Sequence, residues 1–163
     1  MLADLAAYDV DVVLSDAPAS PVNNMRVFSH LLGESGVSFF ALKKLAPLKK
    51  GFPRSLDGAP FLLPLEDRAF RRDLNEWFYS HKIQPLVQGE FADFALLRVF
   101  AEQGFGIFAA PSVIEEQLRA YRFQNIGKTN QIAVRFYALS LERQLQHPAV
   151  VAICDAARRA VFR

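Results

Sequence analysis

The sequence predicts an α/β fold, and two observations support this class. First, residues 84–112 have the pattern of one strand–helix–strand unit: an apolar extended run, an amphipathic segment and a second apolar run. Second, further short apolar runs alternate with amphipathic segments on both sides of this unit. A right-handed crossover between parallel strands is the expected arrangement. Units of this kind bind small ligands beyond the carboxyl ends of their strands, at helix N-termini.

The central unit is predicted in the following order. Gln84–Gln88 is a short strand, and the helix after it has one wide apolar face, formed by Phe94, Leu96, Leu97, Val99 and Phe100. Gly104 ends this helix, because glycine adopts the left-handed conformation without a side-chain clash. Gly106–Ala110 is almost wholly apolar, as in a strand covered on both faces. Pro111 and Ser112 then end the strand and begin another helix.

Composition limits the classes of protein that the chain can represent. With 163 residues, of which 52% are hydrophobic, the chain can form one ordinary domain or two small lobes. A net charge of +2 is too small to indicate binding to nucleic acid or to an anionic membrane. No apolar run approaches the roughly 18 residues that span a bilayer, and the first residues lack the basic region of a secretory signal. Cys154 is the only cysteine, so we expect a reduced, cytoplasmic protein.

The N-terminal part of the chain predicts a helix followed by strands. Leu2–Ala6 suggests a short helix, and Val10–Leu14 a buried strand with a turn after it. A crossover helix normally connects two parallel strands, so we expect this polypeptide to begin inside a larger fold. Met25–Leu32 and Val37–Leu42 are predicted as two extended runs, separated by the segment Gly33–Gly36.

The next segments predict a helical turn, a strand and a strongly amphipathic helix. Lys43–Lys50 is a basic, exposed turn or loop broken by Pro47, and Pro60–Leu63 is a strand. In the helix, apolar residues recur at positions i, i+4, i+7 and i+8, and three charged residues lie outside the apolar face. The apolar residues are Phe70, Leu74, Trp77 and Phe78, and the charged ones are Arg71, Arg72 and Asp73.

The C-terminal part predicts a helix, two strands and a last helix. Val113–Leu118 is the first helix, and Tyr121–Ile126 and Ile132–Leu139 are the strands. The last helix carries Val150, Cys154, Ala157 and Val161 on one apolar seam. No Gly/Ser-rich linker marks a boundary, so any two lobes must be joined by strands.

Catalytic and metal-binding motifs find little support. His30, His81 and His147 are far apart and none has ligand spacing to another His or Cys; we interpret the first as a hydrogen-bonded strand residue and the others as helix-end residues. Cys154 is interpreted as a packing residue. No G-x-S-x-G or phosphate-binding loop is present, and Gly104-Phe105-Gly106 is better explained as a helix end than as a dinucleotide motif. The chain offers no acid/base pair for an enzyme, and we expect neither a cofactor nor a metal.

Candidate binding residues occur where strands end and helices begin. Free backbone N–H groups at such turns, with a few side-chain oxygens, would hold a small polar ligand. The carboxylates among these residues could instead attract a cation, or Asp67 and Asp93 could merely cap helices. The candidates are Asp16, Pro18, Ser20, Leu65, Glu66, Asp67, Phe91, Ala92, Asp93, Pro111 and Ser112.

This succession of segments resembles the effector-binding domain of LysR-type transcriptional regulators. The resemblance rests on three pieces: Ala7–Asp16 (AYDVDVVLSD), the Gly-x-Gly-Ile-x-x-x-Pro pattern of Gly104–Pro111, and His147–Ile153 (HPAVVAI) after an aromatic strand. It covers nearly the whole chain. The phrases LLGESGVSFFA, QGEFADFALL and RFYALSLERQLQHPAVVAI are most similar to the sodium-responsive activators of that family.

The resemblance implies two Rossmann-like lobes joined by crossing strands, like a type 2 periplasmic binding protein. Lobe I would comprise residues 1–35 and 137–163, truncated at its N-terminus, and lobe II residues 36–136. It further implies a cytoplasmic, dimerising regulatory domain without catalysis, which senses a small-molecule or ion effector, such as sodium, between the lobes. DNA would be contacted only through an N-terminal domain that this chain lacks, and the regulated gene would encode a sodium/proton antiporter. The alternative is a solute-binding protein of a transporter with the same fold.

Overall fold

The computed structural model describes residues 2–19, 26–66, 68–141 and 147–161. Contacts divide the chain into two compact units, Met1–Ser35 with Val134–Arg163 (unit 1) and Gly36–Ala133 (unit 2). Two long strands, β2 (Phe28–Ala41) and β6 (Gln124–Ser140), contribute residues to both units. The two units are therefore connected by paired strands rather than by a loop, in a sheet with the order β1-β6-β2-β5.

Unit 2 is built on parallel strands. β3 (Pro60–Pro64) and β4 (Leu86–Phe91) are parallel, and Pro64 lies opposite Phe91. A parallel bridge between Phe61 and Ile107 connects β3 to the segment that enters β5 (Phe108–Pro111). β5 in turn pairs with β2 in the antiparallel direction. The carboxyl ends of β3, β4 and β5 consequently lie at one edge.

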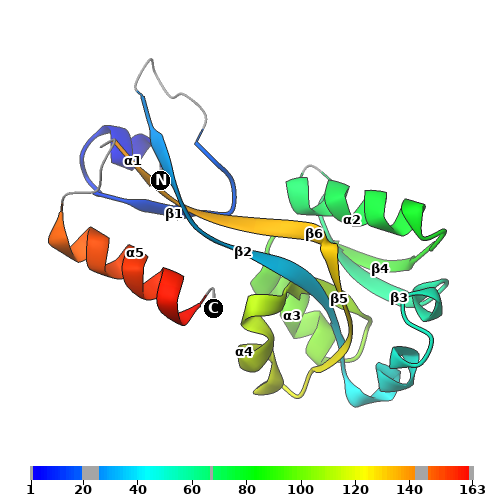
Figure 1. Cartoon of the computed structure of the whole chain (residues 1–163). Coiled ribbons are helices and arrows are strands. Elements are labelled where there is room, and N and C mark those ends of the chain that lie inside the picture. Colours follow the sequence, from blue (N-terminus) through cyan, green and yellow to red (C-terminus); the bar gives the residue numbers. More distant parts are fainter. Residues whose placement is uncertain (1, 20–25, 67, 142–146, 162–163) are drawn as a thin grey trace. The chain divides into compact units, whose positions relative to one another are not determined.

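Helices cover both faces of these strands, because successive strand residues point to opposite sides. On one face Phe39 and Phe61 contact Trp77 and Phe78 of α2 (Ala69–Ser80). On the other face a core forms against α3 (Phe94–Glu102) and α4 (Glu115–Arg119), and it contains Phe40, Leu62, Phe91, Leu97, Ala101, Phe108, Ala110, Leu118 and Phe123. Figure 1 shows α2 on one side of β3 and β4, and α3 on the other. Two short 3₁₀ segments, Lys43–Lys49 and Arg54–Leu56, precede β3, and a third, Ser112–Ile114, follows β5.

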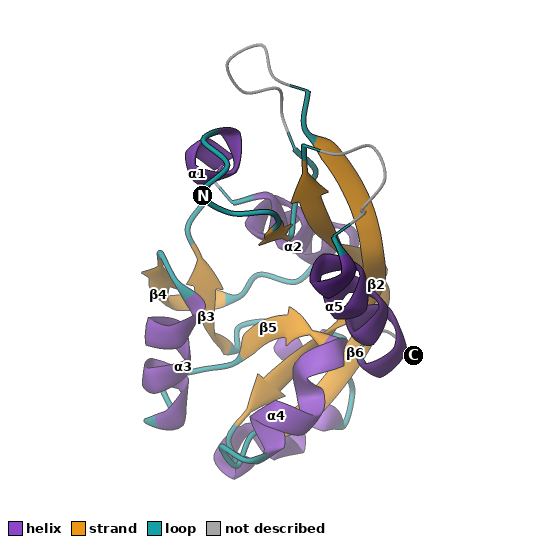
Figure 2. Ribbon diagram, turned by 90° about the vertical axis from the view of Figure 1, so that its left-hand side faces the viewer, coloured by secondary structure: helices purple, strands orange, loops and turns teal. Residues whose placement is uncertain are grey.

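Unit 1 is smaller and has its own core. β1 (Val13–Ser15) pairs antiparallel with the end of β6, so that Val13 lies opposite Leu139. α1 (Leu2–Ala6) packs Leu5 against Val13 and Leu139. α5 (Pro148–Ala160) packs Val150 and Cys154 against Leu32 and Ala138, with Ala157 alongside. Figure 2 shows both helices beside these strands.

Several predicted elements are confirmed with shifted boundaries. The strand expected at Val10–Leu14 begins at Val13, and the strand expected at Gln84–Gln88 runs from Leu86 to Phe91. The helix before Gly104 is confirmed, and Gly104 has the expected positive φ of 81°. Pro47 does not break its segment, which continues as a 3₁₀ helix to Lys49. In α3 only Leu97 and Ala101 are buried, while Leu96, Val99 and Phe100 remain exposed.

The predictions for the long strands were wrong. Gly33–Gly36 does not separate two runs but lies inside the continuous strand β2, and β6 likewise runs without a break through residues 127–131. Hydrogen-bonded pairing between the two strands keeps the backbone extended at these polar and glycine residues. Gly36 is required there, because a Cβ atom would lie 2.5 Å from Asn130 Oδ1 and 2.9 Å from the carbonyl oxygen of Thr129. At the C-terminus, the predicted seam residue Val161 lies beyond α5 and is exposed.

Candidate functional site

The carboxyl edge of unit 2 brings together most of the residues that the sequence singled out. β3 is followed by Leu65 and Glu66, β4 by Ala92 and Asp93, and β5 ends in Pro111 before Ser112. Because the three strands are parallel to one another, these three turns lie at the same edge. The residues Leu65, Glu66, Ala92, Asp93, Pro111 and Ser112 are called the strand-edge site below.

Hydrogen bonds to two backbone carbonyl groups hold the first two turns against each other. The amide of Leu65 donates to the carbonyl oxygen of Phe91 over 3.1 Å. The guanidinium of Arg68 donates to the carbonyl oxygen of Ala92 over 3.3 Å. The side chain of Phe91 is buried and packs on the Phe100 ring at 5.1 Å, so Phe91 contributes backbone rather than a side chain to this edge.

The carboxylate of Asp93 caps helix α3. Its Oδ1 atom accepts a hydrogen bond from the amide of Leu96 over 2.8 Å, which is the usual N-cap contact. The alternative reading of Asp93 as a helix cap is thus confirmed. In α2, by contrast, the N-cap residue Arg68 makes no side-chain cap to the first turn. Glu66 is exposed at the start of this helix.

Arg71 corrects one prediction. We expected its side chain outside the apolar face of the helix, but it is buried. Its Nη1 atom donates to Glu90 Oε1 and to the carbonyl oxygen of Pro64, each over 2.7 Å. Its Nε atom donates to Asn75 Oδ1 over 3.0 Å. These partners compensate for burying the charge, and they link α2 to the ends of β3 and β4. The spacing of Arg71 to Leu74 and Phe78, i+3 and i+7, is the signal that could have indicated its inward position.

Ser112 belongs to a polar cluster that the sequence did not indicate. Its hydroxyl lies 2.7 Å from the buried hydroxyl of Ser38. Asn125 Nδ2 donates to Ser38 Oγ over 3.3 Å and to Glu115 Oε2 over 2.7 Å. Arg119 donates to the other Glu115 oxygen over 2.9 Å. Only the tertiary structure brings these residues together, because Ser38 and Asn125 come from β2 and β6.

The cluster sets the ionisation of Glu115. Partial burial raises the pKa of this carboxyl group. The hydrogen bonds from Asn125 and Arg119, with the positive charges of Arg119 and Lys128, outweigh burial and leave the pKa below its ordinary value. Glu115 is therefore an anion at neutral pH, and it links α4 to Asn125 of β6.

The remaining candidates lie elsewhere or outside the described residues. Asp16 and Pro18 belong to unit 1, where they follow β1 and are exposed. Ser20 and Asp67 lie outside the described residues. His30 donates to or accepts from Ser140 Oγ at 3.0 Å, and His81 and His147 lie at helix ends, as expected. Cys154 is buried in the core of unit 1, and burial raises the pKa of its thiol.

The strand-edge site offers groups for binding rather than for bond breaking. It presents exposed carboxylates at Glu66 and Asp93 and the hydroxyl of Ser112. Within the described part of the chain, no three His, Cys, Asp or Glu side chains are placed to hold a metal ion. Nor is any described helix long and apolar enough to cross a bilayer.

Helix-covered parallel strands, joined through two shared long strands, define an α/β domain of the type 2 periplasmic-binding-protein kind, as the sequence predicted. Residues 1–161 match the family described as the LysR substrate binding domain. The chain belongs to this family, and it is an effector-binding domain of the LysR type. This match does not favour the alternative of a transporter's solute-binding protein.

Two curated relatives with higher sequence identity belong to the same class of transcriptional regulators. The chain is 33% identical over 168 aligned positions to the transcriptional activator protein NhaR of Escherichia coli (strain K12). The same values apply to the NhaR protein of Shigella flexneri. In each case 99% of this chain is covered but only 54% of the relative, so the chain spans about half the length of these relatives.

Solved structures confirm the fold. HinK, a LysR family transcriptional regulator from Pseudomonas aeruginosa, is similar with a TM-score of 0.71 at 12% identity, over 99% of this chain and 57% of HinK. The effector binding domain of QuiR in complex with shikimate gives a TM-score of 0.67 at 16% identity, over 99% of this chain and 78% of that domain. DarR of Vibrio fischeri, solved in complex with DNA, gives 0.65 at 17% identity over 97% of this chain and 53% of DarR.

Proposed function

We propose that this chain is the effector-sensing, dimerising regulatory domain of a cytoplasmic LysR-type activator, and that the regulated gene encodes a sodium/proton antiporter. The similarity to the NhaR activators over 99% of the chain supports this proposal. In this proposal DNA contact comes from a separate DNA-binding domain; the structural neighbour DarR was solved in complex with DNA. The role is that of a sensor without catalysis.

The two compact units support an assignment of two regulatory lobes. In this assignment residues 1–35 with 137–163 form lobe I, and residues 36–136 form lobe II. The effector binds between them and contacts the strand-edge site from lobe II, together with Asp16, Pro18 and Ser20 from lobe I. A ligand that binds one arrangement of lobes more tightly shifts the population toward that arrangement. The effector binds the two arrangements with different free energies, and this difference sets how strongly effector binding changes DNA binding.

The observation that carries the proposal is the convergence of three parallel strand ends on one polar edge. Glu66 and Asp93 place exposed carboxylates at this edge, where Glu66 also lies 3.9 Å from Arg71, and in this proposal Asp16 and Asp67 contribute further carboxylates. A small cation such as sodium, or a small molecule with hydrogen-bond donors, fits acceptors of this kind.

Exposed apolar residues of unit 2 support the proposed dimer. They lie on β4, on α3 and just after α3, and they are Leu86, Val87, Leu96, Val99, Phe100 and Phe105. β4 is also the edge strand of its two-stranded sheet. Large apolar patches on soluble domains mark contact sites, and pairing with a second copy would cover this one by isologous contact.

The test measures effector-dependent stability of the 163-residue chain. Its melting temperature is followed against NaCl, with KCl at equal ionic strength as reference, and against small organic anions. A bound effector raises the melting temperature as its concentration increases. The variant Asp67→Asn with Asp93→Asn removes two charges, and asparagine at position 93 preserves the cap of α3.

Loss of the effector-dependent shift in this variant is the expected result. The matched control, Asp11→Asn with Glu116→Gln, removes two exposed charges elsewhere and should retain the shift. An unchanged response of the Asp67/Asp93 variant, or the absence of any ligand that stabilises the parent chain, would contradict the proposed site.

A further inference from the structure

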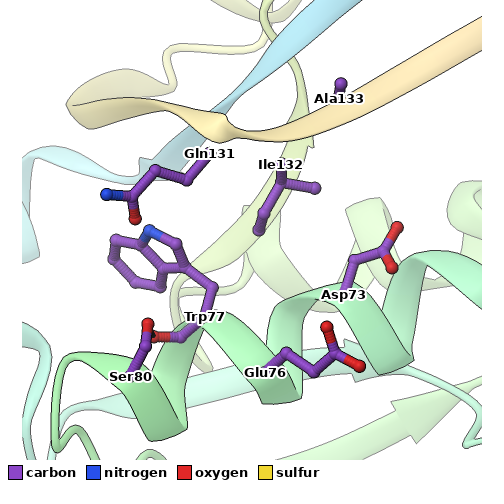
Figure 3. A pocket seen from close by; sticks show the side chains of 7 residues that line it. All are labelled: Asp73, Glu76, Trp77, Ser80, Gln131, Ile132 and Ala133. Atoms are coloured by element: carbon purple, nitrogen blue, oxygen red, sulfur yellow. Dashed lines mark hydrogen bonds between the residues drawn. The ribbon is translucent and has the colours of Figure 1, made fainter.

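A cavity lies in unit 2 between α2 and β6. It has a volume of about 380 Å³ and is bounded by α2 and by β6. Its lining contains none of the strand-edge residues. Figure 3 shows Asp73, Glu76, Trp77 and Ser80 on the helix, with Gln131 and Ile132 facing them from the strand.

Some polar groups of this cavity already have hydrogen-bond partners within the chain, and others have none among the described side chains. The indole Nε1 of Trp77 donates to Thr129 Oγ1 over 3.1 Å, and the Ser80 hydroxyl donates to the Trp77 carbonyl oxygen over 2.9 Å. Asp73 and Glu76, however, have no ion pair or hydrogen bond to any side chain in residues 2–19, 26–66, 68–141 or 147–161. Two carboxylates three residues apart on one helix face thus border the cavity without a cation.

The requirements for a ligand follow from these groups. Ionised carboxylates only accept hydrogen bonds, so the ligand must supply donors, and two negative charges favour a positively charged ligand. The side-chain carbonyl oxygen of Gln131 can serve as a further acceptor. Ile132 and the edge of the Trp77 ring form an apolar wall, as Figure 3 shows. That wall suits a short aliphatic segment between the charged groups.

The apolar wall is rigid, because Trp77 is fixed on several sides. Its ring lies 4.9 Å from the Phe39 ring and 4.4 Å from the His81 ring, measured between centroids. The hydrogen bond from the indole N–H to Thr129 fixes the orientation of the indole ring. A ligand would therefore meet a preformed surface rather than one that must be ordered on binding.

We propose that this cavity is a binding site for a small aliphatic dication, such as a diamine or an aminoalkyl guanidine. Asp73 and Glu76 bind its two cationic groups, and Ile132 and Trp77 contact the aliphatic chain between them. Gln131, Ile132 and Ala133 are the last residues of unit 2 on β6. The bound cation hence contacts the segment of β6 that leads into unit 1.

The experiment uses agmatine as the probe and the fluorescence of Trp77, the only tryptophan of the chain, as the signal. The 163-residue chain is titrated with agmatine at constant ionic strength. A saturable change in emission is expected, accompanied by a rise in melting temperature. Butane-1,4-diol, which has the aliphatic chain without the charges, is expected to give neither change.

Variants distinguish this site from the strand-edge site. Asp73→Asn with Glu76→Gln should weaken agmatine binding about tenfold or more, because charge-assisted hydrogen bonds are lost. Both side chains are exposed and form no ion pair or hydrogen bond with a described side chain, so the variant should fold normally. The matched control Asp11→Asn with Glu116→Gln should bind as the parent does.

Three results would each overturn the proposal. They are an unchanged affinity in the Asp73/Glu76 variant, an equal response to butane-1,4-diol, and loss of agmatine binding only when Glu66 and Asp93 are neutralised. The last result would assign the cation to the strand-edge site instead.

Discussion

The guanidinium Nη1 of Arg71 lies 2.7 Å from the carboxylate of Glu90, and this pair joins α2 to β4 at the strand-edge site. The Arg71 side chain is 7% exposed, whereas the Glu90 side chain is 38% exposed. The two partners therefore differ in how well water can replace the interaction. The buried arginine also fixes the carbonyl of Pro64, so the ends of two strands depend on one side chain.

The first prediction is that Arg71 contributes more to stability than Glu90. Arg71→Ala should lower the free energy of unfolding by about 2–4 kcal/mol, because it removes several buried hydrogen bonds and leaves a void. Glu90→Gln should cost about 1 kcal/mol or less, because the exposed partner is solvated in either case. Urea unfolding measures both. Arg159→Ala, an exposed arginine of α5, is the control and should lie within about 0.5 kcal/mol of the parent; equal losses in all three variants would contradict the assignment.

The second prediction concerns the hydrogen bond between Trp77 and Thr129. Thr129→Val preserves the shape of the side chain but leaves the indole N–H without its acceptor, and the amide of Gln131 loses the same oxygen. Unfolding should become easier by about 1–3 kcal/mol. Thr129→Ser retains the hydroxyl and should cost less than the valine variant. If valine proves as stable as serine in a thermal melt, the hydroxyl has no such role.

The third prediction concerns Gly36, where β2 and β6 approach closely. Gly36→Ala places a Cβ atom against the carbonyl oxygen of Thr129 and the side chain of Asn130. We expect a loss of about 1–3 kcal/mol, because the backbone must move apart to relieve the contact. Adding Asn130→Ala removes one of the two contacts and should restore part of the loss. A double variant no more stable than Gly36→Ala alone would place the whole clash on the backbone.

The fourth prediction is a pH dependence due to Glu115. Its pKa in the folded chain is below the ordinary value of 4.5, so the folded state binds the proton less readily than the unfolded state does. The stabilisation is fully present above the ordinary pKa and is lost as the pH falls from about 4.5 through the lower folded pKa. Glu115→Gln should therefore reduce the slope of unfolding free energy against pH in that range. Measurements between pH 6 and pH 3 test this, and identical slopes for parent and variant would exclude Glu115 as the cause.

Local sequence patterns predicted those parts of the fold that depend on neighbouring residues. The helix over Phe70–Phe78 and the glycine stop at Gly104 follow from side-chain spacing and from backbone sterics, which operate within a few residues. The family resemblance added the expectation of two lobes, which no local pattern contains. In the strand-edge site, strand ends could be recognised because turns and helix caps have local signals.

Long-range pairing decided what the local patterns did not. Gly33–Gly36 has the composition of a turn, yet β6 pairs with β2 there and makes the strand continuous. The helical spacing of Arg71 to Leu74 and Phe78 places its side chain inward, but the partners that compensate for burying its charge, Pro64 and Glu90, lie on other elements.

The sequence by itself determined the α/β class, the family, and the strand ends at which a ligand site can form. Only the tertiary structure decided the burial of Arg71, the Ser38–Ser112–Asn125 cluster and the cavity between α2 and β6. The physical reason is the range of the interactions. Helix periodicity and turn chemistry are encoded within a few residues, whereas hydrogen-bond partners and cavities depend on residues that only folding brings together.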